Sequence, residues 1–125
     1  KRMIIIILFY NIIIMIYKGS CHCGAVNFEV ETDLKIIKQC NCSICIRKYA
    51  KMGMAKKEQL KVTKGENNLS LYQFGSVIAK HYFCKTCGVY THHGRKSDPN
   101  GIGFNIGCLD GVDPFTIQSD ILDNK

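Results

Sequence analysis

Short runs in which apolar and polar residues alternate recur along most of the chain. The clearest lies at residues 25–31, where Val26, Phe28 and Val30 alternate with polar side chains. A period of two residues is typical of a strand with one buried face. Similar runs, separated by turn-forming residues, predict further strands. Their ranges are 36–40, 59–63, 69–74, 77–83, 89–93 and 102–106.

Helical periodicity is almost absent. Residues 43–48 can form one helical turn, but no run after residue 18 supports a helix of ten or more residues. Residues 15–19 lead into a strand, and residues 96–101 (KSDPNG) form a strong turn signal. The pattern therefore predicts a mostly β fold, a small domain of short, mainly antiparallel sheets.

The first 14 residues are unusually rich in isoleucine. A signal peptide or membrane anchor is one interpretation, but no small-residue cleavage site follows. A helix over residues 3–17 would span roughly 22 Å, less than the ~30 Å hydrocarbon core of a bilayer. We expect residues 1–14 to be an apolar extension, or upstream sequence translated in frame before a start at Met15. Residues 15–125 are expected to form one domain.

Seven of the eight cysteines fall into three tight clusters. These are C-x-C at Cys21 and Cys23, C-x-C-x-x-C at Cys40, Cys42 and Cys45, and C-x-x-C at Cys84 and Cys87. Close-spaced thiols on tight turns can direct several sulfurs at one zinc ion. The two pairs predict a closed four-cysteine site, which would cross-link distant parts of a small domain and add metal-binding free energy to folding.

The remaining cluster, Cys40, Cys42 and Cys45, is the more informative one. Three thiolates leave the fourth position of a tetrahedral zinc ion open, which is typical of a catalytic site. Alternatively, Cys108 completes a second closed four-cysteine site. A third interpretation, which we favour, is that Cys108 is a small buried apolar residue.

Eight cysteines are also compatible with a secreted disulfide scaffold. We favour reduced, metal-bound cysteines in a cytoplasmic protein. Metal binding also changes the charge, because seven thiolates contribute −7 and two zinc ions +4, which lowers the formal net charge from +7 to +4. The remaining basicity is mild and no dense Lys/Arg block accompanies it, so charge alone does not predict a nucleic-acid partner.

The histidines are secondary candidates. His22 lies inside the first C-x-C and is expected to point away from the metal, and His81 is expected to be a packing residue in a strand. His92 and His93 are adjacent in a predicted strand, so at most one of them can face a given site. A polar and basic loop containing Arg95, Lys96 and Ser97 follows them.

Four motifs together resemble the glutathione-dependent formaldehyde-activating enzyme family, which includes centromere protein V. They are residues 18–26 (KGSCHCGAV), 40–45 (CNCSIC), 82–88 (YFCKTCG) and 105–110 (NIGCLD). The resemblance runs from about residue 15 to residue 115. It implies a β-tent fold with two zinc ions per chain, one structural and one catalytic. The structural zinc ligands would be Cys21, Cys23, Cys84 and Cys87, and the catalytic ones Cys40, Cys42 and Cys45, the same division that the spacing predicts.

The implied activity is that of a zinc-dependent carbon–sulfur lyase. It would add glutathione to formaldehyde, forming S-hydroxymethylglutathione, or act on a related thiol–aldehyde adduct. Within this interpretation, His93, Arg95 and Ser97 are predicted to hold substrate carboxylates or to move a proton. The alternative is a non-catalytic, zinc-stabilised binding module associated with chromatin or nucleic acid. No membrane partner is expected unless residues 1–14 are an anchor.

Overall fold

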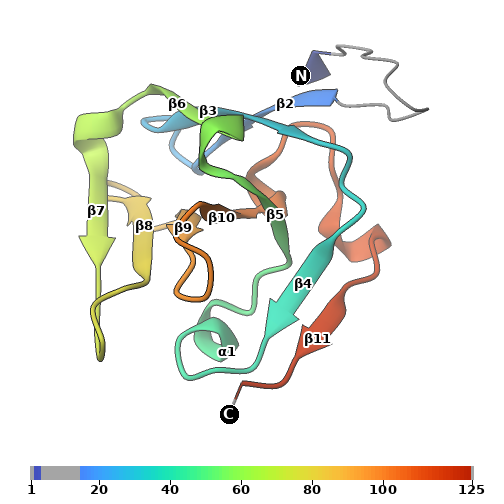
Figure 1. The fold of residues 1–125 in the computed structure, drawn as a ribbon. Coiled ribbons are helices and arrows are strands. Elements are labelled where there is room, and N and C mark those ends of the chain that lie inside the picture. The colour runs from blue at the N-terminus through green and yellow to red at the C-terminus, as the bar shows by residue number, and fades with distance from the viewer. Residues whose placement is uncertain (1, 4–14, 125) are drawn as a thin grey trace.

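The computed structural model describes residues 2–3 and 15–124 of the 125-residue chain. Its strands form two sheets (Figure 1). The smaller sheet has the order β1-β2-β3-β6. Its strands are β1 (Arg2–Met3), β2 (Met15–Ser20), β3 (Asn27–Thr32) and β6 (Leu60–Lys64).

The larger sheet has the order β11-β4-β5-β10-β9-β8-β7. Its strands are β4 (Ile37–Cys40), β5 (Met52–Lys56), β7 (Leu69–Tyr72), β8 (Lys80–Cys84), β9 (Tyr90–Gly94), β10 (Gly101–Asn105) and β11 (Asp120–Leu122). Every pairing in both sheets is antiparallel except that of β11 with β4. The predicted fold class is therefore confirmed.

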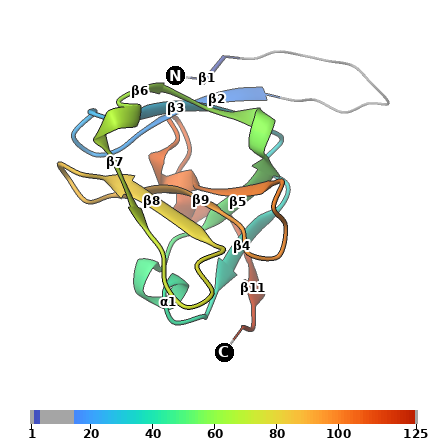
Figure 2. The same cartoon turned by 60° about the vertical axis from the view of Figure 1, so that its left-hand side comes forward.

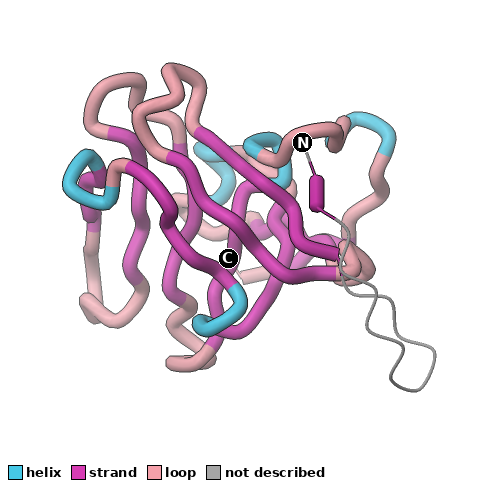
Figure 3. The backbone as a smooth tube through the Cα atoms, turned by 90° about the horizontal axis from the view of Figure 1, so that it is seen from above, coloured by secondary structure: helices cyan, strands magenta, loops and turns pink. Residues whose placement is uncertain are grey.

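Within residues 2–3 and 15–124, helical structure is limited to single turns between strands (Figure 3). The α-helix α1 (Cys45–Lys48) falls within the helical turn predicted at residues 43–48. The 3₁₀ turns span Lys57–Gln59, Glu66–Asn68, Ile106–Cys108 and Pro114–Thr116.

The core lies where the two sheets pack together. Alternation along β3 buries Phe28 and Val30, which are 1% and 0% exposed, while neighbouring polar residues stay nearer the surface. Ile37 of β4 and Phe104 of β10 belong to the same buried cluster. In Figures 1 and 2 the smaller sheet covers one end of the larger one, and α1 lies at the opposite end beside β11.

Three strands in the described part of the chain were not predicted: β1, which has two residues, β5, whose sequence is MGMAK, and β11, which has three residues. The strands that were predicted are all present, and their ends differ from the prediction by a few residues. Residues 4–14 of the expected apolar extension lie outside the described residues. No helix in the described part of the chain is long and apolar enough to cross a membrane.

Candidate metal centres

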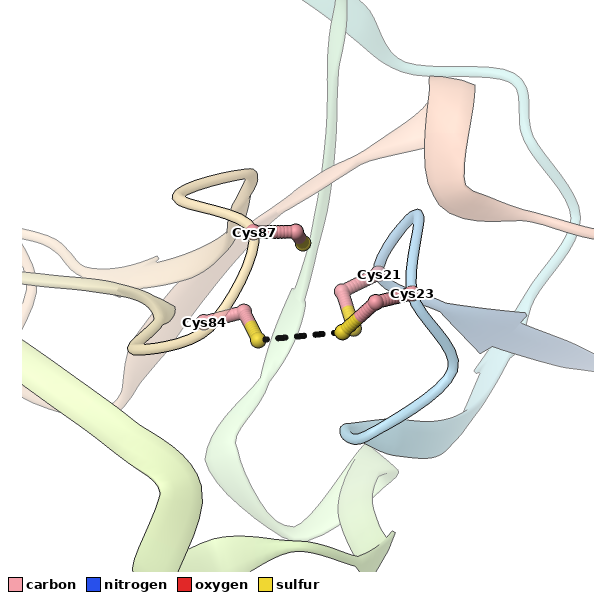
Figure 4. A group of neighbouring side chains, drawn as sticks. All are labelled: Cys21, Cys23, Cys84 and Cys87. Atoms are coloured by element: carbon pink, nitrogen blue, oxygen red, sulfur yellow. Dashed lines mark hydrogen bonds between the residues drawn. The ribbon is translucent and has the colours of Figure 1, made fainter.

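Two similar turns bring four cysteines together (Figure 4). Cys21 and Cys23 follow the end of β2, while Cys84 ends β8 and Cys87 lies in the turn after it. In each turn a glycine donates its backbone N–H to the first cysteine's carbonyl, Gly24 to Cys21 at 3.3 Å and Gly88 to Cys84 at 2.9 Å. The φ angles of Gly24 and Gly88 are 80° and 77°, a left-handed conformation that glycine adopts without steric cost.

The sulfur positions fit a tetrahedral zinc ion. The four sulfurs lie within 4.8 Å of one another. The Sγ atom of Cys23 lies 3.7 Å from that of Cys21 and 3.7 Å from that of Cys84. A tetrahedron with Zn–S bonds of about 2.3 Å has edges of about 3.8 Å, so these separations already match the metal's geometry.

Hydrogen-bond donors reach the sulfurs of Cys21, Cys84 and Cys87. The backbone N–H of Val26 donates to Cys21 Sγ at 3.3 Å, and the side-chain amide of Asn68 donates to Cys84 Sγ at 3.3 Å. Hydrogen bonds from the backbone of Cys23 and Val89 lower the pKa of Cys87 to about 6. A thiolate is the metal-binding form of cysteine, so the residues present suit a bound zinc ion.

The second cluster gathers three cysteines. Cys40 ends β4, Cys42 lies in the following loop and Cys45 begins α1. Their sulfurs also lie within 4.8 Å of one another. Burial raises the pKa of Cys42, but backbone hydrogen bonding from Cys45 and the neighbouring sulfurs outweigh it and lower that pKa overall. Burial and the nearby Cys42 raise the pKa of Cys45 to about 12. We call these three residues the cysteine trio.

Cys108 belongs to neither cluster. It is 8% exposed and packs in the main core cluster, as the third interpretation expected. Its Sγ lies 3.5 Å from the carbonyl oxygen of Tyr90. Burial raises the pKa of Cys108 to about 12, so it remains a thiol. Among the described residues, therefore, no fourth cysteine completes the trio.

The trio opens onto a cleft of about 920 Å³. Apolar side chains from the trio loop, β5, the segment after β7, and β11 line much of it: Ile44, Met52, Met54, Phe74, Ala79 and Leu122. Polar and basic side chains line the rest: Asn41, Ser43, Ser76, His81, His93, Arg95, Lys96, Ser97 and Asn124. This size and mixture suit a small organic ligand that carries charge.

The sequence profile of the glutathione-dependent formaldehyde-activating enzyme family matches residues 16–122. The chain belongs to this family. A crystal structure of a protein from Rhodobacter sphaeroides is similar in fold, with a TM-score of 0.81 and 45% sequence identity. That match covers 84% of this chain and 99% of the other. Family membership supports a function related to glutathione and formaldehyde, and the two cysteine clusters can hold metal ions, in keeping with zinc.

The side chains predicted to act on the family's substrates lie together. His93, Arg95 and Ser97 all line the trio's cleft. His92 does not line it, and instead stacks on Tyr82 with ring centroids 4.7 Å apart. The expectation that only one of the two adjacent histidines can face the site is met. His22 is exposed in the four-cysteine turn.

Sequence reasoning missed a group of side chains beside the cleft. Lys48 Nζ lies 2.8 Å from His81 Nδ1, and Tyr90 Oη lies 2.6 Å from His93 Nδ1. Burial lowers the pKa of Lys48 to about 8, so its ammonium form still dominates near pH 7. His81 is buried, as expected of a packing residue, yet it also lines the cleft. Lys48 and Tyr90 carry no local motif that would have singled them out.

Proposed function

We propose that this protein is a zinc-dependent carbon–sulfur lyase that joins glutathione to formaldehyde. In this reaction the thiol sulfur forms a bond to the carbonyl carbon and the C=O π bond breaks. The thiol's proton ends on the oxygen, which gives S-hydroxymethylglutathione. The observation that carries the proposal is the position of three cysteine sulfurs, without a fourth among the described residues, at a large mixed cleft.

Cys40, Cys42 and Cys45 would hold the catalytic zinc. When bound there, zinc would supply an open coordination position that favours the thiolate form of a substrate thiol at neutral pH. The side chains around the cleft would bind and orient the substrates.

The mixed polar and apolar lining of the cleft suits different parts of the substrates. Arg95 and Lys96 provide positive charge for the carboxylates of glutathione, and Ser97 provides a hydroxyl beside them. Met54 and Phe74 add apolar surface to the lining of the same cleft, which would strengthen polar interactions with a bound substrate. This arrangement would hold the thiol in one orientation, and the entropy cost of bringing it to the aldehyde would fall accordingly.

The four-cysteine cluster is assigned a structural zinc. It joins the end of β2 to the end of β8, which lie in different sheets. Both clusters require reduced thiols, so we place the protein in the cytoplasm, where disulfides are rare.

The proposal is tested by measuring zinc content and initial rate in parallel. Purified wild-type protein should contain two zinc ions per chain and should accelerate S-hydroxymethylglutathione formation above the uncatalysed rate. Cys42→Ser should lose one zinc ion and the acceleration while remaining folded by circular dichroism. No acceleration by metal-replete wild-type protein would contradict the lyase. Salt-dependent binding to duplex DNA by that same inactive protein would support the binding-module alternative.

A further inference from the structure

Four side chains next to the cleft form one connected block. Lys48 Nζ contacts His81 Nδ1 at 2.8 Å, and Tyr90 Oη contacts His93 Nδ1 at 2.6 Å. The two imidazole rings stack with centroids 5.7 Å apart and an interplanar angle of 22°. Lys48 Nζ also lies 3.8 Å from the centroid of the Tyr90 ring, which connects the two pairs.

The contact with Lys48 fixes the tautomer of His81. An ammonium group has only donors, so the Nδ1 of His81 must accept. The ring is neutral near pH 7, because burial and the positive charge of Lys48 lower the pKa of His81 to about 4. The ring proton of His81 is therefore on Nε2.

The same assignment follows for His93. Burial and the charge of Lys48 lower the pKa of His93 to about 3, so this ring is neutral. Burial raises the pKa of Tyr90, so its hydroxyl keeps its proton. The cation over the phenol ring withdraws electron density from it and makes the hydroxyl a better donor than acceptor. Tyr90 therefore donates to Nδ1 of His93, and the ring proton is again on Nε2.

Neither Nε2 atom is hydrogen-bonded within the described part of the chain, and both rings line the cleft. His81 and His93 are 6% and 8% exposed. Among the described residues, every buried side-chain nitrogen or oxygen has a hydrogen-bond partner. Because the two Nε2 atoms have none, they are not buried in the interior. Their N–H groups are left to meet a ligand.

We propose that His81 and His93 form an oxygen-binding site: two neutral imidazoles, oriented by Lys48 and Tyr90, donate Nε2–H groups to the aldehyde oxygen. This rests on the proposed function. As the thiol sulfur bonds to the carbonyl carbon, the C=O π electrons move to the oxygen, which carries negative charge until it takes up the proton released by the thiol. Preorganised donors aimed at such an oxygen stabilise the transition state. The helix α1 begins at Cys45 and ends at Lys48, so one short element supports the trio and the donor site.

The orientation is tested by NMR on the zinc-loaded, full-length chain with ¹⁵N-labelled histidine. Long-range ¹H–¹⁵N spectra should show an unprotonated Nδ1 and a protonated Nε2 for His81 and His93. Lys48→Met should disturb the pattern of His81, and Tyr90→Phe that of His93. The matched controls Lys35→Met and Tyr49→Phe change exposed residues and should leave both patterns intact. An Nδ1–H tautomer at either ring in the wild type would overturn the inference.

The chemical role is tested by steady-state kinetics. His81→Phe keeps an aromatic ring for stacking but removes the donor, so kcat should fall about 100-fold with little change in the KM for glutathione. His81→Gln places an amide N–H near the former Nε2 and should recover part of that loss. Lys48→Met should lower kcat about 10-fold, and Lys48→Arg should restore most of it. An unchanged kcat in His81→Phe would overturn the role while leaving the lyase function in place.

A binding probe separates the donor site from the lyase function. Formate presents an anionic oxygen of the right size and should shift the Nε2–H signals of both histidines in the wild type. It should shift the His81 signal less in Lys48→Met. If the wild type shows no lyase activity but these shifts occur, the oxygen-binding site stands and the proposed reaction fails. If the shifts do not occur, the site itself is wrong whatever the activity.

Discussion

The side-chain amide of Asn124 lies 3.4 Å from the sulfur of Cys40, although 84 residues separate them. The parallel pairing of β11 with β4 produces this contact, because it aligns Leu122 with Cys40. The loop is fixed further where Asn41 accepts from the backbone N–H of Asn124 at 2.8 Å. The chain's last described residues therefore support the cysteine trio with a donor to one of its sulfurs.

Replacing Asn124 should weaken metal binding by the trio. Asn124→Ala removes the donor to Cys40 but keeps the backbone contact with Asn41, and we expect about a 10-fold loss of zinc affinity at this site. Competition with a chromogenic chelator would measure the affinity of each site. Asn67→Ala, at an exposed asparagine on the 3₁₀ turn before β7, is the matched control. Equal zinc retention in the two variants would show that the amide has no such role.

Local spacing is why the cysteine sites could be predicted. Cys21 and Cys23, like Cys84 and Cys87, are brought together by turns only a few residues long, each with a glycine at positive φ. By contrast, Lys48 and His81 are 33 residues apart and meet only because α1 lies beside β8. No sequence period connects such a pair, so the block beside the cleft could not be predicted.

The strands also divide into those that a local sequence pattern predicts and those that depend on contacts between distant residues. The alternation of apolar and polar residues predicted β3, because the apolar side chains of this strand are the ones that are buried. The sequence of β5 has no β-branched or aromatic residue and so little strand propensity of its own. It is a strand because it pairs with β10 over five residues and with β4 on its other edge. Tertiary pairing, which a local pattern does not contain, determines this central strand.

Cysteine substitutions should separate the two metal sites by stability. Cys84→Ser removes one ligand from the four-cysteine cluster, and we expect the loss of one zinc ion and a Tm lower by at least ~10 °C, because metal binding there is coupled to folding. Cys42→Ser should lose one zinc ion with a much smaller change in Tm. Zinc analysis and thermal melts on the same samples would test both.

Cys108→Ser serves as the control for these variants. Its hydroxyl can donate to the carbonyl of Tyr90 as the thiol does, so both zinc ions should be retained. Loss of one zinc ion from Cys108→Ser would mean that Cys108 binds metal after all. In that case the trio would be closed, and the case for a catalytic site there would weaken sharply.

Gly103 should be essential for the position of His93. A Cβ at residue 103 would lie 2.1 Å from Cε1 of His93, the facing residue on β9, so Gly103→Ala must displace that ring. We expect a loss of about 1–3 kcal/mol in unfolding free energy together with a fall in kcat. Gly94→Ala is a matched control, because its Cβ would meet nothing closer than 3.6 Å. If both variants retain full activity, the ring position of His93 is unimportant for the reaction.

The protein should lose stability in mild acid, and His92 should account for a definable part of the loss. Burial lowers the pKa of His92 from 6.5 to about 4 in the folded chain. The unfolded chain therefore binds the proton more readily, so stability is complete above pH 6.5 and declines as the pH falls towards 4. This ring is 5% exposed and contributes up to about 3 kcal/mol over that range.

The contribution of His92 is isolated by comparing wild type with His92→Phe. Phenylalanine keeps the stacking on Tyr82 but cannot take up a proton, so its free energy of unfolding should depend less on pH between 6.5 and 4. Chemical denaturation at several pH values would measure this for both proteins. Loss of metal in acid affects the two alike, so their difference reports the histidine alone. Parallel pH profiles would mean that His92 titrates normally in the folded protein.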